Sequence, residues 1–223
     1  GDDFSRYRSY RDQRQDSGGL FPIFHTATTF IDESNGFWIC GFNDANELVH
    51  TQALRLLDLS GISLGKHLDT HRHKYIVPDT TPDPDLTFFR GPEALKLVTG
   101  TVVYVGDFWL PSRGLGGPRS QGATGLLARL GSELLLQTWQ PDFAFAFVPK
   151  RLAAKGAHLR YGYSHCEPGK WIGPDQQITD EEYLIWMNSD DIKNVLAREV
   201  QSLRTSSRAS SVSLSLAAID TKG

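Results

Sequence analysis

The chain has 223 residues, of which 39% are hydrophobic and 22% charged, and its formal net charge is −3. These values are typical of a globular domain and exclude collagen-like, coiled-coil and wholly disordered chains. The negative balance disfavours nucleic acid and membrane surfaces as partners, and no apolar run reaches the ~20 residues that cross a bilayer.

The first part of the chain predicts a helix followed by strands. The charged segment 1–19 has aromatic residues at a spacing that favours a short helix: Phe4, Tyr7 and Tyr10. A β-rich composition then predicts three antiparallel strands, over residues 23–31, 36–42 and 48–59. Residues 60–98, with the stretch VPDTTPDPD, indicate a long inserted surface loop.

The middle of the chain predicts a strand, a helix and a second strand. Residues 100–111 form an apolar run that is typical of a buried strand, and a glycine-rich bend follows. A helix after the bend carries apolar residues that we expect on one face: Leu126, Leu127, Leu130, Leu134 and Leu135. Phe143, Phe145 and Phe147 alternate in the next strand, 143–149, and are expected in the core.

The last part of the chain predicts short elements and a tail. Residues 150–159 favour a helical turn, residues 181–188 a strand, and a capped amphipathic helix begins near Ser189. We expect one domain over residues 20–203 and a loosely docked Ser-rich tail over 204–223. The fold class is therefore α/β, with a mixed, mostly antiparallel twisted sheet flanked by helices.

The two cysteines, Cys40 and Cys166, match no metal-binding spacing. Two thiols in a chain of this length are typical of reduced packing residues, although a disulfide stays open. The charged start of the chain differs from a secretory signal peptide. We expect a cytoplasmic protein.

Alternating polar residues in GKHLDTHRHK would share one face of an extended strand: His67, Asp69, His71 and His73. Two or three of these side chains have the chemistry to bind zinc. Because no matching ligand cluster accompanies them, a solvated polar face is favoured and no metal is expected.

The stretch GGPRSQGATGLLARL, residues 116–130, places glycines and an arginine where a helix begins. The first N–H groups of a helix lack intrahelical partners and carry the positive end of the helix dipole, so they bind anions. Glycine lets such backbone approach a phosphate closely. The alternative is that Gly and Pro merely end the preceding strand.

Two short motifs in this order of elements resemble the GNAT acyl-CoA N-acyltransferases. The sequence Arg119-Ser120-Gln121-Gly122-Ala123-Thr124 is similar to the family motif Gln/Arg-x-x-Gly-x-Gly/Ala at a helix start, with Thr124 where Gly or Ala is usual. RYGYSHCEP is similar to the family's GF or GY segment, and the order of elements matches over residues 20–190. A second register of the first motif uses Arg113 to Gly117.

The resemblance implies that acetyl-CoA or another acyl-CoA is the donor substrate. Its pyrophosphate would lie on the backbone of residues at the helix start: Gln121, Gly122, Ala123, Thr124 and Gly125. Arg119 would add a charge-assisted hydrogen bond, against the alternative of a solvated side chain. The strand edge at Phe108, Trp109 and Leu110 would offer backbone groups to the pantetheine arm.

The same resemblance implies an acid that protonates the leaving thiolate. The family's tyrosine lies four residues before the GF glycine, and here that offset from Gly162 gives His158, with Tyr161 as its nearest rival. Asp107, on the strand before the bend, is the candidate base, with the alternative that it caps a turn. His158 has the alternative of an ordinary helix-end residue.

The resemblance predicts an N-acyltransferase, most simply an N-acetyltransferase, whose acceptor is a small-molecule amine or a protein or peptide amine. Two alternatives are a silent CoA-binding module and an acyltransferase for longer chains, such as an acyl-homoserine-lactone-type synthase. The acceptor is not identified by the sequence, and a homodimer is possible because exposed strand edges can pair.

Overall fold

The computed structural model describes residues 1–14, 19–76, 83–111 and 122–198. The strands are β1 (Gly36–Phe42), β2 (Leu48–Leu59), β3 (Phe88–Arg90), β4 (Gly100–Trp109), β5 (Phe143–Pro149), β6 (His165–Pro168), β7 (Lys170–Ile172), β8 (Ile178–Asp180) and β9 (Glu182–Asn188). The helices are α1 (Phe4–Arg11), α2 (Leu64–His71), α3 (Ala94–Leu97), α4 (Ala123–Trp139), α5 (Lys150–Ala153) and α6 (Ala157–Tyr161). Short 3-10 turns are η1 (Pro22–Phe24), η2 (Arg72–Tyr75), η4 (Pro84–Leu86) and η5 (Pro174–Gln176).

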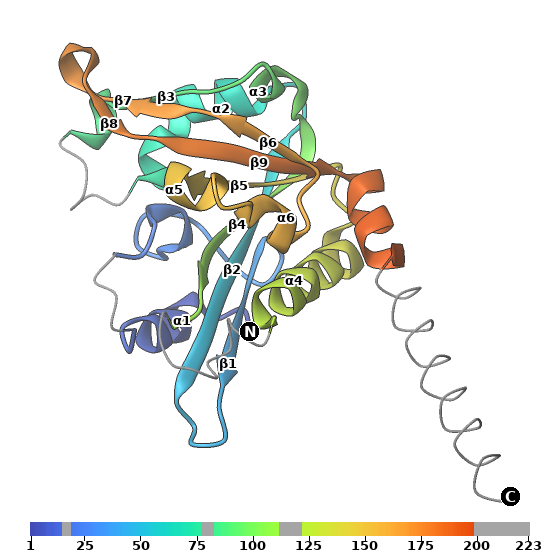
Figure 1. Ribbon diagram of the computed structural model, residues 1–223. Coiled ribbons are helices and arrows are strands. Elements are labelled where there is room, and N and C mark those ends of the chain that lie inside the picture. The colour runs from blue at the N-terminus through green and yellow to red at the C-terminus, as the bar shows by residue number, and fades with distance from the viewer. Residues whose placement is uncertain (15–18, 77–82, 112–121, 199–223) are drawn as a thin grey trace, which may run out of the picture.

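Six strands form one sheet in the order β1-β2-β4-β5-β9-β6, and β3, β7 and β8 form a smaller sheet (Figure 1). In the six-stranded sheet β4 and β5 pair in parallel, and the other neighbouring strands pair antiparallel. Helix α4 connects the two parallel strands, as a parallel pair requires. The expected fold class, and the expected strand, helix and strand across the glycine-rich bend, are confirmed.

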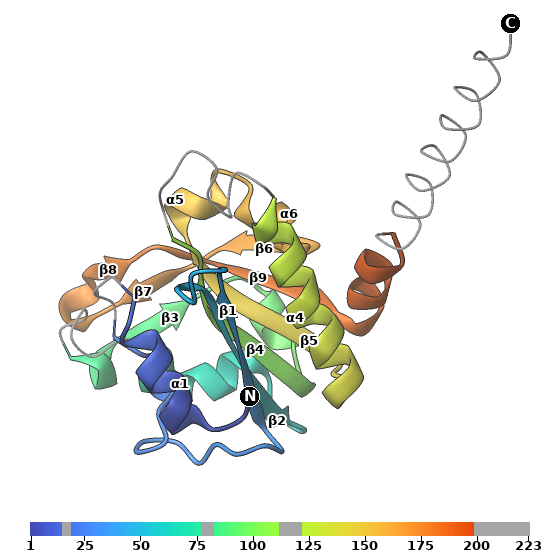
Figure 2. The same ribbon diagram turned by 90° about the horizontal axis from the view of Figure 1, so that it is seen from below.

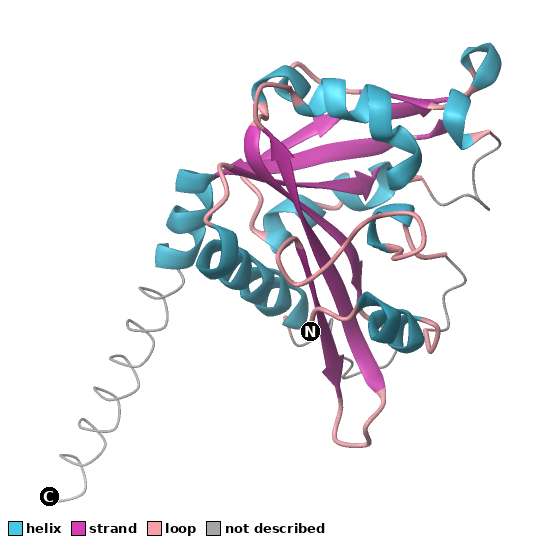
Figure 3. Ribbon diagram, turned by 180° about the vertical axis from the view of Figure 1, so that it is seen from behind, coloured by secondary structure: helices cyan, strands magenta, loops and turns pink. Residues whose placement is uncertain are grey.

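Helices cover both faces of the large sheet, which Figures 2 and 3 show from two further sides. Successive residues of a strand point to opposite faces, so Tyr104 and Phe145 join a core with α1, η1 and α2. Val103 and Ala144 join a second core with α4, α5 and α6. The sheet therefore separates two packed layers, here called the α1 layer and the α4 layer.

The parallel pairing of β4 with β5 is short. Within the described residues it joins Val102–Tyr104 to Phe143–Phe145, although β4 continues to Trp109 and β5 to Pro149. A bulge also interrupts β4 against β2, because Ala53 lies opposite Gly106 while Thr51 lies opposite Trp109. Asp107 in this bulge has φ 51, a left-handed backbone that few non-glycine residues adopt. The two strands consequently diverge beyond Tyr104.

The predicted N-terminal helix is confirmed as α1. Asp3 caps it by accepting hydrogen bonds from the backbone N–H groups of Ser5 and Arg6. Phe4 and Tyr7 are buried under the sheet, and the ring of Tyr10 lies 5.6 Å from that of Trp38. Helix α1 therefore packs into the core through Phe4 and Tyr7.

The strand predicted over residues 23–31 is wrong, and the first two strands of the sheet are β1 and β2. Pro22 begins the turn η1, and the hydroxyls of Thr28 and Thr29 donate to the Pro22 carbonyl at 2.9 and 3.0 Å. The backbone N–H groups of Thr28 and Thr29 also both donate to the His25 carbonyl at 3.0 Å, so this backbone pairs locally and not in a ladder. Ile23 and Phe24 are buried in the α1 layer.

The surface loop predicted over residues 60–98 is also wrong for most of its described part. It holds α2, η2, η4, β3 and α3, and its buried residues include Leu64, Leu68 and Leu95. Ser63 caps α2 through a hydrogen bond from Lys66 N–H, and Leu64 and Leu68 lie one turn apart on its buried side. The loop was predicted from the Pro- and Asp-rich stretch VPDTTPDPD, which follows α2, and the helical spacing of Leu64 and Leu68 before it was not used.

The extended strand assumed for the four alternating polar residues is therefore wrong as well. His67 is buried and its Nε2 lies 2.8 Å from the Tyr75 hydroxyl, and its ring lies 4.8 Å from that of His71. Asp69 and His73 are exposed. Burial and the nearby His71 lower the pKa of His67 to about 4, so the ring is neutral near pH 7.

The apolar face predicted for α4 is right for Leu135, which is buried, and wrong for Leu126 and Leu130. Leu126 and Leu130 are 63% and 42% exposed, and the buried residues are Ala128, Gly131, Ser132 and Leu135. A Cβ on Gly131 would lie 2.4 Å from the side chain of Gln52, so small residues let the helix approach β2 closely. Helix α4 packs through its small side chains.

The predicted elements at the end of the described chain are confirmed. Helices α5 and α6 occupy residues 150–161, β9 follows, and a helix begins at Ser189 and runs through 198. Asn188 and Asp191 cap that helix reciprocally, each side chain accepting from the other's backbone N–H at 2.8 and 3.2 Å. The tail 204–223 lies outside the described residues. In the described part no helix is both long and apolar enough to span a membrane.

Candidate functional site

A cavity of about 550 Å³ lies where β4 and β5 diverge. It is lined by the second halves of both strands, by α4, by residues of α5 and α6, and by the start of β9. Phe21 and Tyr75 line it from the α1 layer. This volume suits a small organic ligand.

The cavity reaches both layers of the protein. Tyr104 and Phe147 line it and belong to the core of the α1 layer, whereas Ala146 and Val148 line it and belong to the α4 layer. Gly106 lines it from β4 and, like Ala146, has little side-chain bulk. Residues of both layers therefore line the cavity between the diverging strands, and this part of the cavity is here called the passage.

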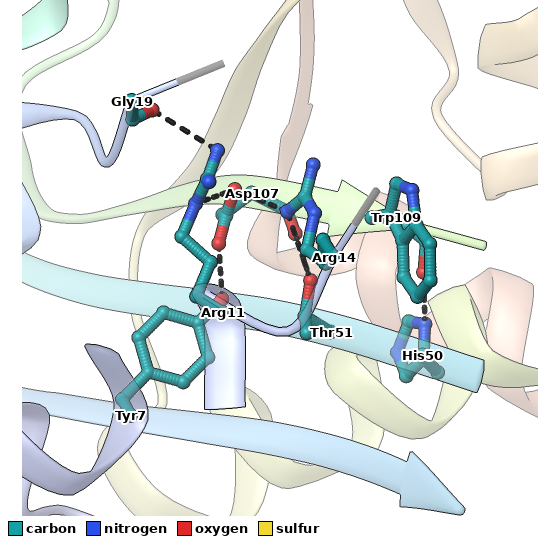
Figure 4. A network of polar contacts seen from close by, with 8 residues as sticks. All are labelled: Tyr7, Arg11, Arg14, Gly19, His50, Thr51, Asp107 and Trp109. Atoms are coloured by element: carbon teal, nitrogen blue, oxygen red, sulfur yellow. Dashed lines mark hydrogen bonds and ion pairs between the residues drawn. The ribbon is translucent and has the colours of Figure 1, made fainter. Parts of the chain in front are cut away.

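Asp107 forms a buried polar cluster at the bulge, drawn in Figure 4. Its Oδ1 accepts from Arg11 Nε at 3.2 Å and from Arg14 Nη1 at 2.7 Å, and the Tyr7 hydroxyl donates to its Oδ2. The side chains of Arg11 and Arg14 are each 7% exposed and that of Asp107 is 2% exposed. The Thr51 hydroxyl also donates to the Asp107 carbonyl at 3.0 Å, which fixes the bulge to β2.

The predicted role of Asp107 as a base receives no support from this geometry. Both carboxylate oxygens already accept hydrogen bonds: Oδ1 accepts from two guanidinium groups and Oδ2 from the Tyr7 hydroxyl. Burial and then the Asp107 charge raise the pKa of Tyr7 well above its ordinary value, so this phenol stays a donor. The cluster instead joins α1 to the bulge. This is a structural role, and it is closer to the alternative that Asp107 caps a turn than to the role of base.

Two buried polar residues of β2 lie beside the end of β4. His50 Nδ1 lies 2.8 Å from the Trp109 carbonyl oxygen, and desolvation lowers the pKa of His50, so its ring is neutral and donates. Gln52 is 2% exposed and lines the cavity. The Gln52 side chain interacts with the ring of His50, but among the described residues neither Gln52 Oε1 nor His50 Nε2 has a partner at ordinary hydrogen-bond distance. A buried acceptor of this kind favours a ligand N–H.

The predicted strand-edge residues fall into two groups. Phe108 and Trp109 line the cavity, and the guanidinium of Arg14 stacks over the Trp109 ring at 5.2 Å. Leu110 is buried and lies outside the cavity lining. On its β5 side, β4 beyond Tyr104 presents a backbone edge that its described neighbours leave unpaired.

The predicted phosphate-binding residues are only partly described. Arg119, Gln121 and the alternative register at Arg113 lie outside the described residues. Gly122 precedes α4 with φ 76, and no side chain of the described residues caps the helix. Ala123, Thr124 and Gly125 form the first turn, and a Cβ on Gly125 would lie 3.3 Å from the Arg160 carbonyl oxygen. Gly125 therefore also has a packing role against α6.

The two candidate acids occupy different places on α6. Tyr161 lines the cavity, and its ring lies 5.0 Å from that of Phe108. His158 is outside the cavity lining, and its Nδ1 is buried without a hydrogen-bond partner among the described residues. The family offset from Gly162 therefore selects His158, which lies outside the cavity lining. Tyr161, one helical turn further along α6, lines the cavity.

Glu182 is a cavity residue that the sequence analysis missed. It begins β9 opposite Pro149 of β5, and its Oε2 accepts a hydrogen bond from Trp171 Nε1 at 2.9 Å. Desolvation raises the pKa of this carboxyl from 4.5 to about 7. The adjacent Glu181 is exposed and forms an ion pair with Lys150 at 2.9 Å, so composition alone does not distinguish the two glutamates.

No family model and no curated protein matches the chain. Among solved structures it is similar to FeeM, an N-acyl amino acid synthase from uncultured soil microbes, at 13% identity and TM-score 0.44 over 86% of this chain and 92% of that one. It is similar to a spermidine N-acetyltransferase chimera of the Vibrio cholerae enzyme and hSSAT, at 5% identity and TM-score 0.43 over 85% and 93% of the two chains. It is also similar to Arabidopsis thaliana NAA60 in complex with acetyl-CoA, at 12% identity and TM-score 0.40 over 83% and 93%.

Proposed function

We propose that the chain is an acyl-CoA-dependent N-acyltransferase of the GNAT type, which moves an acyl group from a CoA thioester to an amine. The observation that carries the proposal is the passage between β4 and β5, because residues of both layers of the protein line it. A donor entering from the α4 layer and an acceptor entering from the α1 layer would meet inside the sheet. Such a meeting point orients two substrates and excludes water.

The α4 side of the passage offers groups that fit the pantetheine arm of CoA. The free edge of β4 after Tyr104 presents backbone donors and acceptors to the amide groups of the arm. Gln52 Oε1 would accept from an amide N–H, which would satisfy a buried oxygen. Phe108 and Ala146 line the same side with apolar surface.

The start of α4 is the proposed pyrophosphate site. Gly122 has a positive φ, and no atom of the described residues lies within 4 Å of a Cβ built there. The N–H groups of the first helical turn point out of the helix end and favour an anion. Arg119 and Gln121 are proposed to join them, as the resemblance implies.

Tyr161 is the proposed acid for the leaving thiolate, in place of His158. It faces the cavity beside Phe108, whereas His158 is outside the lining. The C–S bond of the tetrahedral intermediate breaks, and the Tyr161 hydroxyl would give its proton to the sulfur. The phenol would regain a proton from the nitrogen of the new amide through solvent.

A donor with a chain longer than acetyl is the second candidate. The cavity volume of about 550 Å³ far exceeds that of an acetyl group, and four aromatic rings line its α1 side: Phe21, Tyr75, Tyr104 and Phe147. An apolar chain crossing between the strands would bury its surface there.

The test is amine-dependent thiol release from a series of acyl-CoA donors, combined with mass-spectrometric detection of the acylated amine. The proposal expects both signals with the same donor. Thiol release that no amine accelerates, and no amide product for any donor length, would overturn it. The donor length with the highest kcat/KM separates acetyl transfer from transfer of longer chains.

A further inference from the structure

We propose that Glu182 binds the nitrogen of the acceptor and removes its proton, and that the acceptor is a primary amine with an aromatic or aliphatic body. This inference rests on the proposed acyl transfer and assigns its acceptor side.

The position of Glu182 supports an acceptor role. It lines the cavity at the first residue of β9, opposite Pro149, where β5 has already separated from β4. Trp171 Nε1 donates to Oε2, and Trp171 is itself buried against the rings of Phe89 and Phe147. This contact holds the carboxyl in one orientation, and no described residue donates to Oε1. One oxygen is therefore available to a ligand.

Two carboxylates of the described residues line the cavity, Asp107 and Glu182. Of these, only Glu182 has no arginine or lysine of the described chain paired with it and can bind an ammonium group. Asp180 precedes it on the chain and disfavours its ionisation, and Tyr104 of β4 stays a neutral phenol because burial raises its pKa. Across the cavity Asp107 is bonded to Arg11 and Arg14, while Arg151, Tyr161 and Tyr163 line the α5 and α6 side. Burial raises the pKa of Tyr163 as well.

The walls near Glu182 indicate the rest of the acceptor. Phe147 and Tyr104 line the cavity on the same layer, with Phe21 and Tyr75 beyond them. Aromatic faces attract cations and bury apolar groups, and a carboxylate that titrates near neutral pH accepts a proton from a bound ammonium. An acyl chain alone would leave this carboxylate without a partner, so a nitrogen is the better occupant.

The acceptor enters as an ammonium and gives one proton to Glu182, and the freed nitrogen lone pair forms the C–N bond to the thioester carbon. The C–S bond breaks, the nitrogen loses its second proton to solvent, and the sulfur receives one proton from the acid. The products are the amide and the free thiol, and Glu182 returns its proton to solvent.

The experiment compares Glu182→Gln with the matched variant Glu181→Gln, which makes the same change on an exposed neighbour. Benzylamine and its uncharged analogue benzyl alcohol serve as binding probes, measured by calorimetry at pH 8 with the wild-type chain and both variants. Glu182→Gln is expected to weaken benzylamine binding at least tenfold and to leave benzyl alcohol unchanged. Equal benzylamine affinity in Glu182→Gln and wild type would overturn the assignment.

Kinetics add a second readout with benzylamine as acceptor. The wild type is expected to show a kcat/KM that rises through about pH 7, where the Glu182 carboxyl ionises. Glu182→Gln is expected to lose that limb and about 10²-fold or more of kcat/KM, with unchanged acyl-CoA affinity. If kcat/KM of Glu182→Gln still rises through about pH 7, Glu182 is not the base. Failure of the proposed function is distinct, because the wild type would then neither bind acyl-CoA nor release thiol.

Discussion

Tyr104 of β4 and Phe145 of β5 form the last of three parallel pairs, and the two strands separate beyond them. The bulge at Gly106 to Trp109 turns the edge of β4, and the cluster on Asp107 holds that bulge to β2 and α1. The passage thus depends on the divergence of β4 and β5 and on the buried cluster that holds the bulge. That cluster joins Asp107 to Arg11 and Arg14, which lie far from it in the sequence.

The helix start at Gly122 is tested by Gly122→Ala with Gly61→Ala as its control. Both glycines have a positive φ and no atom of the described residues within 4 Å of a built Cβ, so both substitutions cost a similar backbone strain of about 1 kcal/mol. Only Gly122→Ala is expected to weaken CoA binding, by about tenfold, because its methyl group would meet the pyrophosphate. Calorimetry with CoA and thermal unfolding measure the two effects, and equal CoA affinity in both variants would rule out this phosphate site.

The choice between the two candidate acids is tested by Tyr161→Phe and His158→Ala. Loss of a general acid is expected to lower kcat about 10²-fold in Tyr161→Phe with little change in the affinity for acyl-CoA. His158→Ala is expected to keep nearly full kcat because the residue lies outside the cavity lining. Steady-state thiol release decides, and the reverse pattern would return the role to His158.

Asp107 is expected to matter for stability. Asp107→Asn removes the counter-charge of two nearly buried guanidinium groups and should lower the free energy of unfolding by about 3 kcal/mol. Asp12→Asn is the matched control, since Asp12 is exposed and its ion pair with Arg8 spans 4.0 Å, so no measurable change is expected. Denaturant unfolding measures both. If Asp107→Asn is as stable as the wild type but its kcat/KM no longer rises with pH, the result would support the predicted role of Asp107 as the base.

The raised pKa of Glu182 predicts how stability depends on pH. The unfolded carboxyl releases its proton near pH 4.5 and the folded one near 7, so the free energy of unfolding falls as pH rises across that window. Above pH 7 the full penalty is on the order of 3 kcal/mol. Glu182→Gln should therefore be more stable than wild type at pH 8 and similar at pH 4, whereas Glu181→Gln should follow the wild type. A loss of stability in Glu182→Gln at pH 8 would indicate a structural carboxylate instead.

Much of the fold was predictable because its signals are local. The alternation in FAFAFVP and the apolar run before the bend identify β5 and β4, and the capped start at Asn188 marks the last helix. The error at residues 23–31 arose because β-rich composition does not reveal that Thr28 and Thr29 bond to a nearby carbonyl. The error on α4 arose because close packing on Gln52 selected small residues over leucines.

The site was harder to predict because it depends on contacts between distant residues. Phe108, Trp109 and Tyr161 were predicted as site residues from the sequence, and they do line the cavity. Glu182 escaped it, because its burial depends on Trp171 and on where β5 ends, and no spacing rule encodes either. Asp107 was noticed, but its partners Arg11 and Arg14 lie about a hundred residues earlier in the chain.

The most direct measurement of the central claim is calorimetric titration of acetyl-CoA into the wild-type chain, Ala146→Leu and Ala154→Leu. Ala146 lines the passage between the strands, whereas Ala154 is exposed beside α5, so the same added bulk fills the passage in only one variant. The proposed function predicts one binding site in the wild type, similar affinity in Ala154→Leu, and at least a tenfold loss in folded Ala146→Leu. No binding to the wild type, or equal binding by both variants, would contradict an acyl-CoA site between β4 and β5.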